Sequence, residues 1–264
     1  LRMSRGLGDV YKRQVQQLFE ITIESLKGRT WEGKEVIVEA LVSLAVKFHV
    51  YVNSHSELSE SLQDVLTAEL GRQNKRYTKQ IIFSYCRFME VFPQPSMVDK
   101  LIQVAQTFFE DGAEDGDSSN KRSKPYSEIS LKSSPKNVEL EDYSIKLLKS
   151  CAKICRPVND VYPYSLFHFI VSKILFLLQE DFVIYTWRTQ VGACEIGSEI
   201  METYNEKFVA VEFEESLRKL WNELFIRNST RETVDNAKIQ LVRFGSKIST
   251  KDAYLRNEIQ RDLI

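Results

Sequence analysis

Apolar residues recur at spacings of three and four along almost the whole 264-residue chain, and this periodicity limits the fold more than any other feature. Such spacing places apolar side chains on one face of an α-helix, whereas the period-two alternation of half-buried strands is almost absent. The chain also has only 10 glycines and 6 prolines, so few residues are available to end helices. The sequence therefore predicts an all-α protein.

The predicted helices are joined by short turns that contain most of the chain's helix-ending residues. Gly28 and Gly71 are expected to end helices, and the Pro93/Pro95 pair stops another. The expected helices cover residues 15–26, 31–52, 57–70, 77–92, 97–110, 140–155, 162–178, 185–204, 207–226, 230–248 and 251–263.

Four of these helices begin in a similar way, with an aromatic residue, then Lys or Gln three residues later, then an apolar or small stripe. The aromatic residues are 46, 66 and 44 residues apart, and the middle spacing contains a polar insertion of about 25 residues. Without that insertion, all three spacings fall near the period of about 40 to 47 residues that is typical of HEAT and armadillo units. The recurring pairs are Trp31 with Lys34, Tyr77 with Gln80, Tyr143 with Lys146, and Trp187 with Gln190.

This recurrence predicts an α-solenoid of HEAT/armadillo-like helix pairs, because one helix pair cannot bury its apolar face without its neighbours. The pairs are expected in two stretches, 15–110 and 138–264. Residues 207–248 fit the length of a further pair, although Arg231 stands where the aromatic residue would be. An irregular helical bundle is the alternative.

Two segments do not continue the helical pattern. Residues 1–14 (LRMSRGLGDVYKRQ) lack an initiator Met and are interpreted as a disordered translation or sequencing artefact. Residues 111–137 are rich in Ser, Gly, Asp and Lys and predict a disordered insertion, because they offer too little apolar surface to offset ordering entropy. Within it, the Ser134-Pro135 pair is either a phosphorylation site or part of an unmodified loop. The chain ends in mid-pattern, which suggests a fragment of a longer protein.

Composition excludes several classes of function. With 36 basic and 37 acidic residues, the chain has a formal net charge of −1, which argues against a nucleic-acid partner. No apolar run is long enough to predict membrane insertion. The four scattered cysteines are too few for a disulfide framework and indicate a reducing compartment.

The sequence contains no recognisable catalytic motif. It lacks HExxH, GxSxG and CxxC patterns and a Gly-rich loop before a helix, and its only histidines are His49, His55 and His168. We therefore expect no enzymatic activity, no cofactor, no metal and no small-molecule substrate. Trp31 and Trp187 are interpreted as packing residues by default, but an exposed Trp would instead be a candidate binding anchor.

One stretch carries a family resemblance. The segment GRTWEGKEVIVEALVSL, residues 28–44, resembles a stretch in the C-terminal part of the large HEAT-repeat adaptor and scaffold protein of the proteasome. The segment YTWRTQVGACEIGSEIM is similar in type but less specific. The matching positions, for which a structural role is expected, are Gly28, Arg29, Trp31, Gly33, Lys34, Glu35, Ala40 and Leu41.

The resemblance implies a non-catalytic scaffold that links or stabilises the 20S core and 19S regulatory particles and supports proteasome assembly and quality control. It also implies a location in cytosol and nucleus. Two alternatives remain open. One is another HEAT or armadillo scaffold or carrier, such as a nuclear-transport receptor or phosphatase scaffold. The other is the helical-repeat arm of a larger enzyme.

Overall fold

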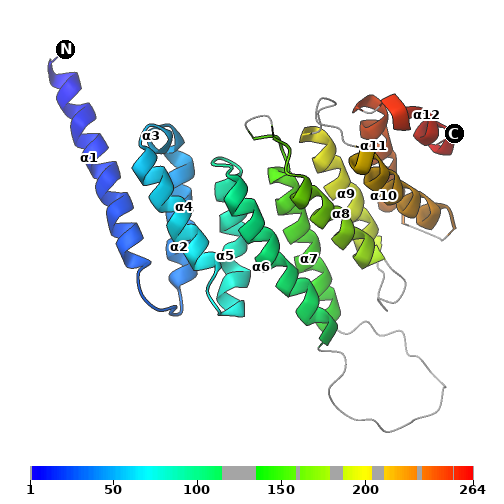
Figure 1. Cartoon of the computed structure of the whole chain (residues 1–264), viewed down its shortest axis with the longest axis horizontal. Coiled ribbons are helices and arrows are strands. Elements are labelled where there is room, and N and C mark those ends of the chain that lie inside the picture. Colours follow the sequence, from blue (N-terminus) through cyan, green and yellow to red (C-terminus); the bar gives the residue numbers. More distant parts are fainter. Residues whose placement is uncertain are drawn as a thin grey trace, which may run out of the picture. The chain divides into compact units, whose positions relative to one another are not determined.

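The computed structural model describes residues 2–114, 135–158, 161–178, 187–203, 211–230, 234–251 and 253–263. Within them, the only feature besides helices and turns is an isolated bridge between Val158 and Val161. The prediction of an all-α solenoid is confirmed (Figure 1). The helices are α1 (Arg2–Ser25), α2 (Lys34–Lys47), α3 (His49–Asn53), α4 (Ser56–Leu70), α5 (Lys75–Met89), α6 (Pro95–Glu114), α7 (Pro135–Ile154), α8 (Tyr164–Leu178), α9 (Trp187–Thr203), α10 (Val211–Thr230), α11 (Asp235–Lys251) and α12 (Ala253–Leu263).

Several observed helix limits differ from the predicted ones. Helix α1 begins at Arg2 instead of residue 15, so residues 2–14 continue the helix, because they contain no proline to stop it. The helix expected over 31–52 starts at Lys34 and divides at Phe48, whose φ of −105° and ψ of 30° interrupt the helical conformation. Helices α6 and α7 extend into the expected disordered segment 111–137, and its central part, 115–134, lies outside the described residues.

The chain divides into two compact units, Leu1–Val104 and Ala105–Ile264, and the boundary falls within α6. In the first unit, α2 packs beside α5, and α4 packs against α5. Arg87 of α5 donates a hydrogen bond to Ser43 of α2 over 3.3 Å, although the two residues are 44 positions apart in sequence. Lys34 at the start of α2 and Tyr77 near the start of α5 also bind the same residue, Glu69, so the two helices run in parallel with an offset of one predicted repeat.

In the second unit, α7, α9 and α11 lie side by side in that order. Lys149 of α7 pairs with Glu195 of α9 over 2.9 Å, 46 positions apart. Lys247 of α11 pairs with Glu202 of α9, 45 positions apart. These contacts join alternate helices about one repeat apart in sequence, so the spacing found in the sequence corresponds to a physical repeat.

Two glycines of α9 allow this row of helices to approach closely. A Cβ atom at Gly192 would lie 2.6 Å from Cγ2 of Ile145 in α7, and one at Gly197 would lie 2.6 Å from Cε2 of Phe244 in α11. Both distances are shorter than a van der Waals contact allows. The two glycines therefore set the spacing of α9 from its neighbour on each side.

All four cysteines are free and buried. Burial raises the pKa of Cys194 to about 12, and it raises that of Cys155 to about 12 although a contact with the Tyr162 hydroxyl acts in the opposite direction. Because the thiolate is the reactive form, we expect an aromatic disulfide reagent at pH 8 to label none of the thiols within minutes in the native protein. In denaturant, all four should react. Rapid native labelling of Cys155 or Cys194 would contradict this placement.

Candidate functional site

The segment 28–35, which carries the family resemblance, forms the turn between α1 and α2. Gly28 has a φ of 87° and Gly33 a φ of 96°, values that glycine adopts without the strain that a Cβ atom brings. The Gly33 amide donates to Oε2 of Glu35 over 3.1 Å, and the Lys34 amide donates to the Trp31 carbonyl over 3.2 Å. These bonds close the turn and start α2 at Lys34.

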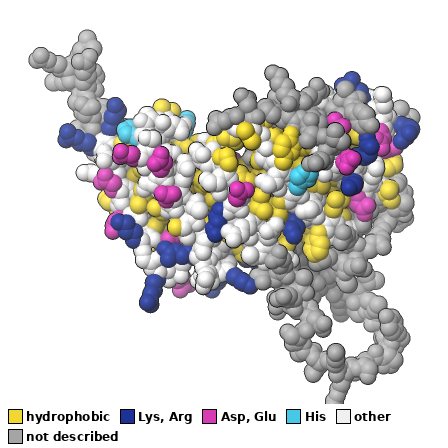
Figure 2. Space-filling model, in the orientation of Figure 1, with side chains coloured by type: hydrophobic (Ala, Val, Ile, Leu, Met, Phe, Trp, Pro, Cys, Tyr) yellow, Lys and Arg dark blue, Asp and Glu magenta, His cyan; other side chains and the backbone are white. Residues whose placement is uncertain are grey.

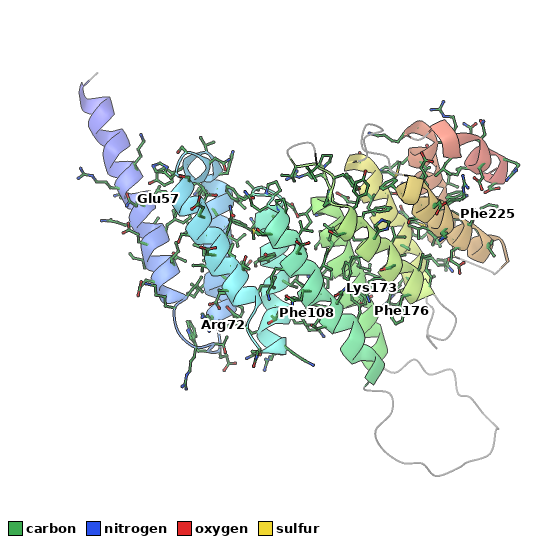
Figure 3. The ribbon with its side chains drawn as sticks, viewed as in Figure 1. Glu57, Arg72, Phe108, Lys173, Phe176 and Phe225 are labelled. Atoms are coloured by element: carbon green, nitrogen blue, oxygen red, sulfur yellow. The ribbon has the colours of Figure 1, made fainter. Side chains whose placement is uncertain are left out.

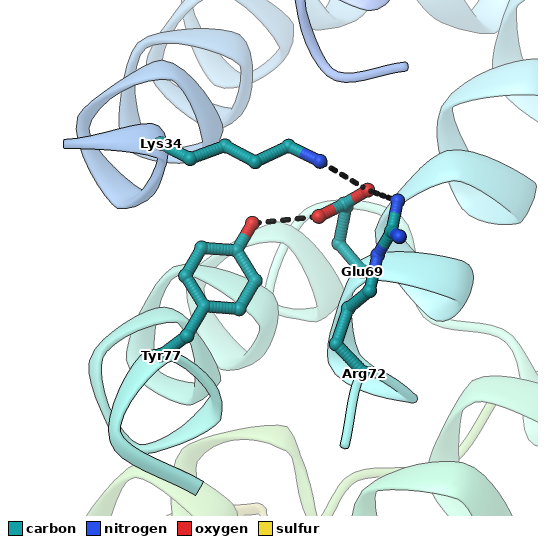
Figure 4. A network of polar contacts seen from close by, with 4 residues as sticks. All are labelled: Lys34, Glu69, Arg72 and Tyr77. Carbon is teal, nitrogen blue, oxygen red and sulfur yellow. Dashed lines mark hydrogen bonds and ion pairs between the residues drawn. The ribbon is translucent and has the colours of Figure 1, made fainter. Parts of the chain in front are cut away.

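Lys34, the first residue of α2, extends its side chain into a buried polar network (Figure 4). Its Nζ atom donates to Oε1 of Glu69 over 3.0 Å, and Arg72 donates to the same oxygen over 2.7 Å. The Tyr77 hydroxyl donates to Oε2 of Glu69 over 2.7 Å. Lys34 is 0% exposed and Glu69 2% exposed, so both charges depend on these partners. The network joins the start of α2, the end of α4 and the start of α5.

Opposing effects set the pKa values in this network. Burial by itself would raise the pKa of Glu69, but the hydrogen bonds from Arg72, Tyr77 and Lys34 outweigh it and lower the pKa below its ordinary value of 4.5. Burial and the hydrogen bond to the Glu69 carboxylate raise the pKa of Tyr77. The ionised carboxylate is therefore the form that the folded chain prefers.

This preference makes stability depend on pH. Because the pKa of Glu69 is lower in the folded than in the unfolded chain, its contribution is complete above pH 4.5 and is lost as the pH falls through the folded-state value. We expect the urea midpoint of the wild-type chain to fall more steeply between about pH 5 and pH 3 than that of Glu69→Gln. If the urea midpoints of the two proteins changed equally with pH, ionisation of Glu69 would not contribute to the pH dependence of stability.

Tyr77 belongs to the repeat pattern of the sequence, whereas no sequence motif marks Glu69 or Arg72 as members of this site. Glu69 follows Leu62 and Leu66 on the buried stripe of α4. A carboxylate at an apolar position of a helix is the signal that could have revealed it, because a buried charge requires partners.

The remaining matching residues fall into two groups. Leu41 is completely buried, in agreement with a structural role, whereas Ala40 and Arg29 are exposed. Trp31 is 51% exposed, and Cζ3 of its ring would lie 3.3 Å from a Cβ atom at Gly33. The motif thus combines residues that hold the turn with residues that solvent and partners can reach.

The four repeat aromatics occupy different environments. Tyr77 is buried, and Tyr143 makes an edge contact with Phe108 of α6, with ring centroids 5.9 Å apart. Trp31 and Trp187 are instead 51% and 44% exposed, and Arg188 lies 5.8 Å from the Trp187 ring. The default packing interpretation of Trp31 and Trp187 therefore does not hold, and the alternative of a binding anchor applies to both.

The second unit has an open groove of about 640 Å³ along α7, α9 and α11. Charged residues of both signs line it, and two of its lysines are paired across the helices as described above. Its lining contains no histidine and no cysteine. The lining residues are Lys149, Glu195, Ser198, Glu199, Gln240, Val242, Arg243, Ser246 and Lys247.

The three histidines belong neither to the lining of the groove nor to the Glu69 network. His49 and His55 contact the backbone carbonyls of Val46 and Tyr51, and the His168 ring lies against Phe167. The described part of the chain holds no group of three or more His, Cys, Asp or Glu side chains placed to bind a metal ion. Among the described helices, none combines the length and apolar composition needed to cross a bilayer.

The helices stack in parallel and expose two tryptophans and a charged groove. These features define an all-α solenoid whose surfaces are suited to binding other proteins. Comparison with known proteins shows which family this solenoid is similar to. Over an alignment of 276 positions it is 38% identical to the proteasome component ECM29 of Saccharomyces cerevisiae, and the match covers the whole chain. The chain is thus part of this proteasome adaptor family. It spans about 15% of the length of the yeast protein. No family model and no solved structure matches it.

Proposed function

We propose that this chain is a segment of a non-catalytic scaffold that binds proteasomes. The observation that carries the proposal is the 38% identity to a proteasome component along the entire chain. The structure supports it physically, because a row of parallel helices presents a continuous surface over which a large partner can make many contacts.

A binding role also agrees with the chemistry of the described surfaces. Catalysis requires a nucleophile or acid near a base of matched pKa in a site from which water is excluded. The groove along α7, α9 and α11 is open and lined by lysine–glutamate pairs, and the Glu69 carboxylate is buried and bonded to Lys34, Arg72 and Tyr77. Such arrangements suit recognition of a protein surface better than a reaction.

The proposal extends to the details that the resemblance implies. The whole protein would contact subunits of the 20S core and the 19S regulatory particle through HEAT-type helix pairs and would support assembly and quality control of the complex. It would act in cytosol and nucleus, without a nucleic-acid, membrane or small-molecule partner. Microscopy of the tagged full-length protein tests the location, and exclusion from either compartment would contradict that part.

Affinity purification tests the central proposal. The tagged full-length protein should recover subunits of both proteasome particles from a lysate at low salt, and at least one of them should remain at about 300 mM salt. A tag-only purification provides the control. Recovery of transport cargo or phosphatase subunits without proteasome subunits at either salt concentration would favour another scaffold and overturn the proposal.

A further inference from the structure

The buried network brings three chain segments together at one end of the first unit. Because Lys34 and Tyr77 both bind Glu69, the residues before α2 lie beside the turn that joins α4 to α5. Lys100 of α6 reaches the same turn, with Nζ 3.4 Å from the position of a Cβ atom at Gly71. We call this end the basic corner and define it by the residues Arg29, Arg72, Lys75, Arg76 and Lys100.

Charge is distributed unequally between the two ends of the first unit. Helix α5 carries four Lys or Arg residues and no Asp or Glu, whereas α4 carries four Asp or Glu residues and no Lys or Arg. Figure 3 labels Glu57 near the start of α4 and Arg72 at the opposite end of the unit. In the left part of Figure 2, several acidic side chains lie toward the top and several basic ones along the lower edge. The net charge of −1 therefore conceals an uneven placement of charge within the first unit.

Most of the basic residues at this corner are accessible. Arg29, Lys75 and Arg76 are exposed, and Arg72 keeps 32% of its side chain exposed while it pairs with Glu69. Glu69 is buried and also bonded to Lys34, so its charge is already balanced inside the protein. The acidic side chains here are the exposed Glu32 of the turn, the half-buried Glu35, and the exposed Asp99, which precedes Lys100 in sequence. The corner therefore presents an excess of positive charge to a partner.

Trp31 supplies an apolar contact surface within this corner. Its side chain is 51% exposed although it is one of the largest apolar groups of the chain. The left-handed Gly33 and the bonds of Lys34 and Glu35 hold the backbone turn that carries this ring. A rigid aromatic group loses little conformational entropy on binding, which is why Trp is common among interface anchors.

We propose that the basic corner is the docking site for an acidic segment of a partner protein, with an apolar side chain of that segment against Trp31. Arg29 and Arg76 bind its carboxylates, since a guanidinium group can donate two parallel hydrogen bonds to one carboxylate. Lys75 and Lys100 add attraction at longer range. The inference deepens the proposed function, because it gives the chemistry of a partner segment, and it does not require that the segment belong to a particular subunit.

An acidic protein segment fits the corner better than nucleic acid does. A nucleic-acid site requires a basic surface that follows several successive phosphates, usually on a protein of net positive charge. Here the basic residues occupy one end of a chain with net charge −1, and Glu32 lies among them. A short segment with spaced carboxylates and one apolar residue matches this small, mixed surface.

Fluorescence anisotropy with the full 264-residue chain tests the proposal. The probe is a labelled 12-residue peptide of Asp, Glu and Ser with a central Leu. Two comparison ligands are used. One is a charge-reversed peptide with Lys in place of the acidic residues, and the other is a single-stranded oligothymidine. We expect saturable binding of the acidic peptide, weakened about tenfold when salt rises from about 50 to 300 mM. Absence of binding, or tighter binding of the oligothymidine, would overturn the proposal.

Charge reversal locates the site. The double variant Arg29→Glu/Arg76→Glu should weaken peptide binding at least about tenfold, and Trp31→Ala should weaken it severalfold. The control Lys153→Glu/Lys219→Glu changes the net charge equally at two exposed residues of α7 and α10 and should leave binding unchanged. Equal losses in both double variants would overturn the assignment. Proteasome purification with the same variants separates the two proposals, because a chain that recovers proteasomes without binding the peptide refutes only this inference.

Discussion

Gly197→Ala is expected to lower the free energy of unfolding of the second unit by about 3 kcal/mol, near the upper end of the usual cost of overpacking a core. The added methyl group would lie 2.6 Å from Cε2 and from Cζ of Phe244, a ring that is completely buried. An aromatic ring in a filled core cannot move away without displacing its neighbours. Trp221, whose ring centroid lies 6.2 Å from that of Phe244, reports the disturbance through its fluorescence during urea unfolding.

Gly71→Ala provides a matched control for this prediction. Gly71 ends α4 with a φ of −78°, which alanine adopts readily, and the nearest atom to an added Cβ is Cε of the flexible Lys100 side chain, 3.3 Å away. The same substitution should therefore change the unfolding free energy by less than about 0.5 kcal/mol. Similar losses at Gly71 and Gly197 would show that the close approach of α9 and α11 does not limit stability.

Lys34→Met should destabilise the first unit by about 3 kcal/mol, because it leaves the buried Glu69 carboxylate without one of its two cationic partners. The double variant Lys34→Met/Glu69→Leu removes both charges and should recover at least half of that loss, since an apolar pair can replace a buried ion pair. Urea unfolding followed by circular dichroism measures both changes.

Lys47→Met tests whether the loss of stability in Lys34→Met arises because Lys34 is buried. Lys47 ends the same helix α2 but is exposed, so its replacement should change stability by less than about 0.5 kcal/mol. If Lys34→Met and Lys47→Met had equal effects, or if the double variant were less stable than Lys34→Met alone, the network would not be a buried ion pair of the kind described.

Much of the helical architecture could be predicted because its signals are local. The apolar stripe of α4, with Leu62, Leu66 and Leu70 buried, follows directly from the spacing of three and four. The start of α2 was placed three residues early, because the sequence does not show that Gly33 adopts a left-handed conformation before the helix. The repeat spacing near 45 residues was also visible, since equivalent helices meet equivalent neighbours, as Lys149 and Glu195 do.

The candidate site was only partly predictable. The motif residues were found by resemblance, but their division into buried and exposed groups depends on distant neighbours. Lys34 is buried because Glu69, 35 residues away in sequence, lies opposite it. A local sequence pattern spans too few residues to predict this pair. Trp31 and Tyr77 have equivalent places in the sequence pattern, yet one is half exposed and the other buried.

The sequence by itself therefore determined the helical class and its repeat, because periodicity acts within a few turns of backbone. The resemblance of residues 28–44 indicated the family. The tertiary structure alone decided which charges are buried, which tryptophans reach solvent, and where basic residues from separate turns gather. The physical reason is that burial and electrostatic environment are set by contacts between helices, such as the approach of α2, α4 and α5 around Glu69.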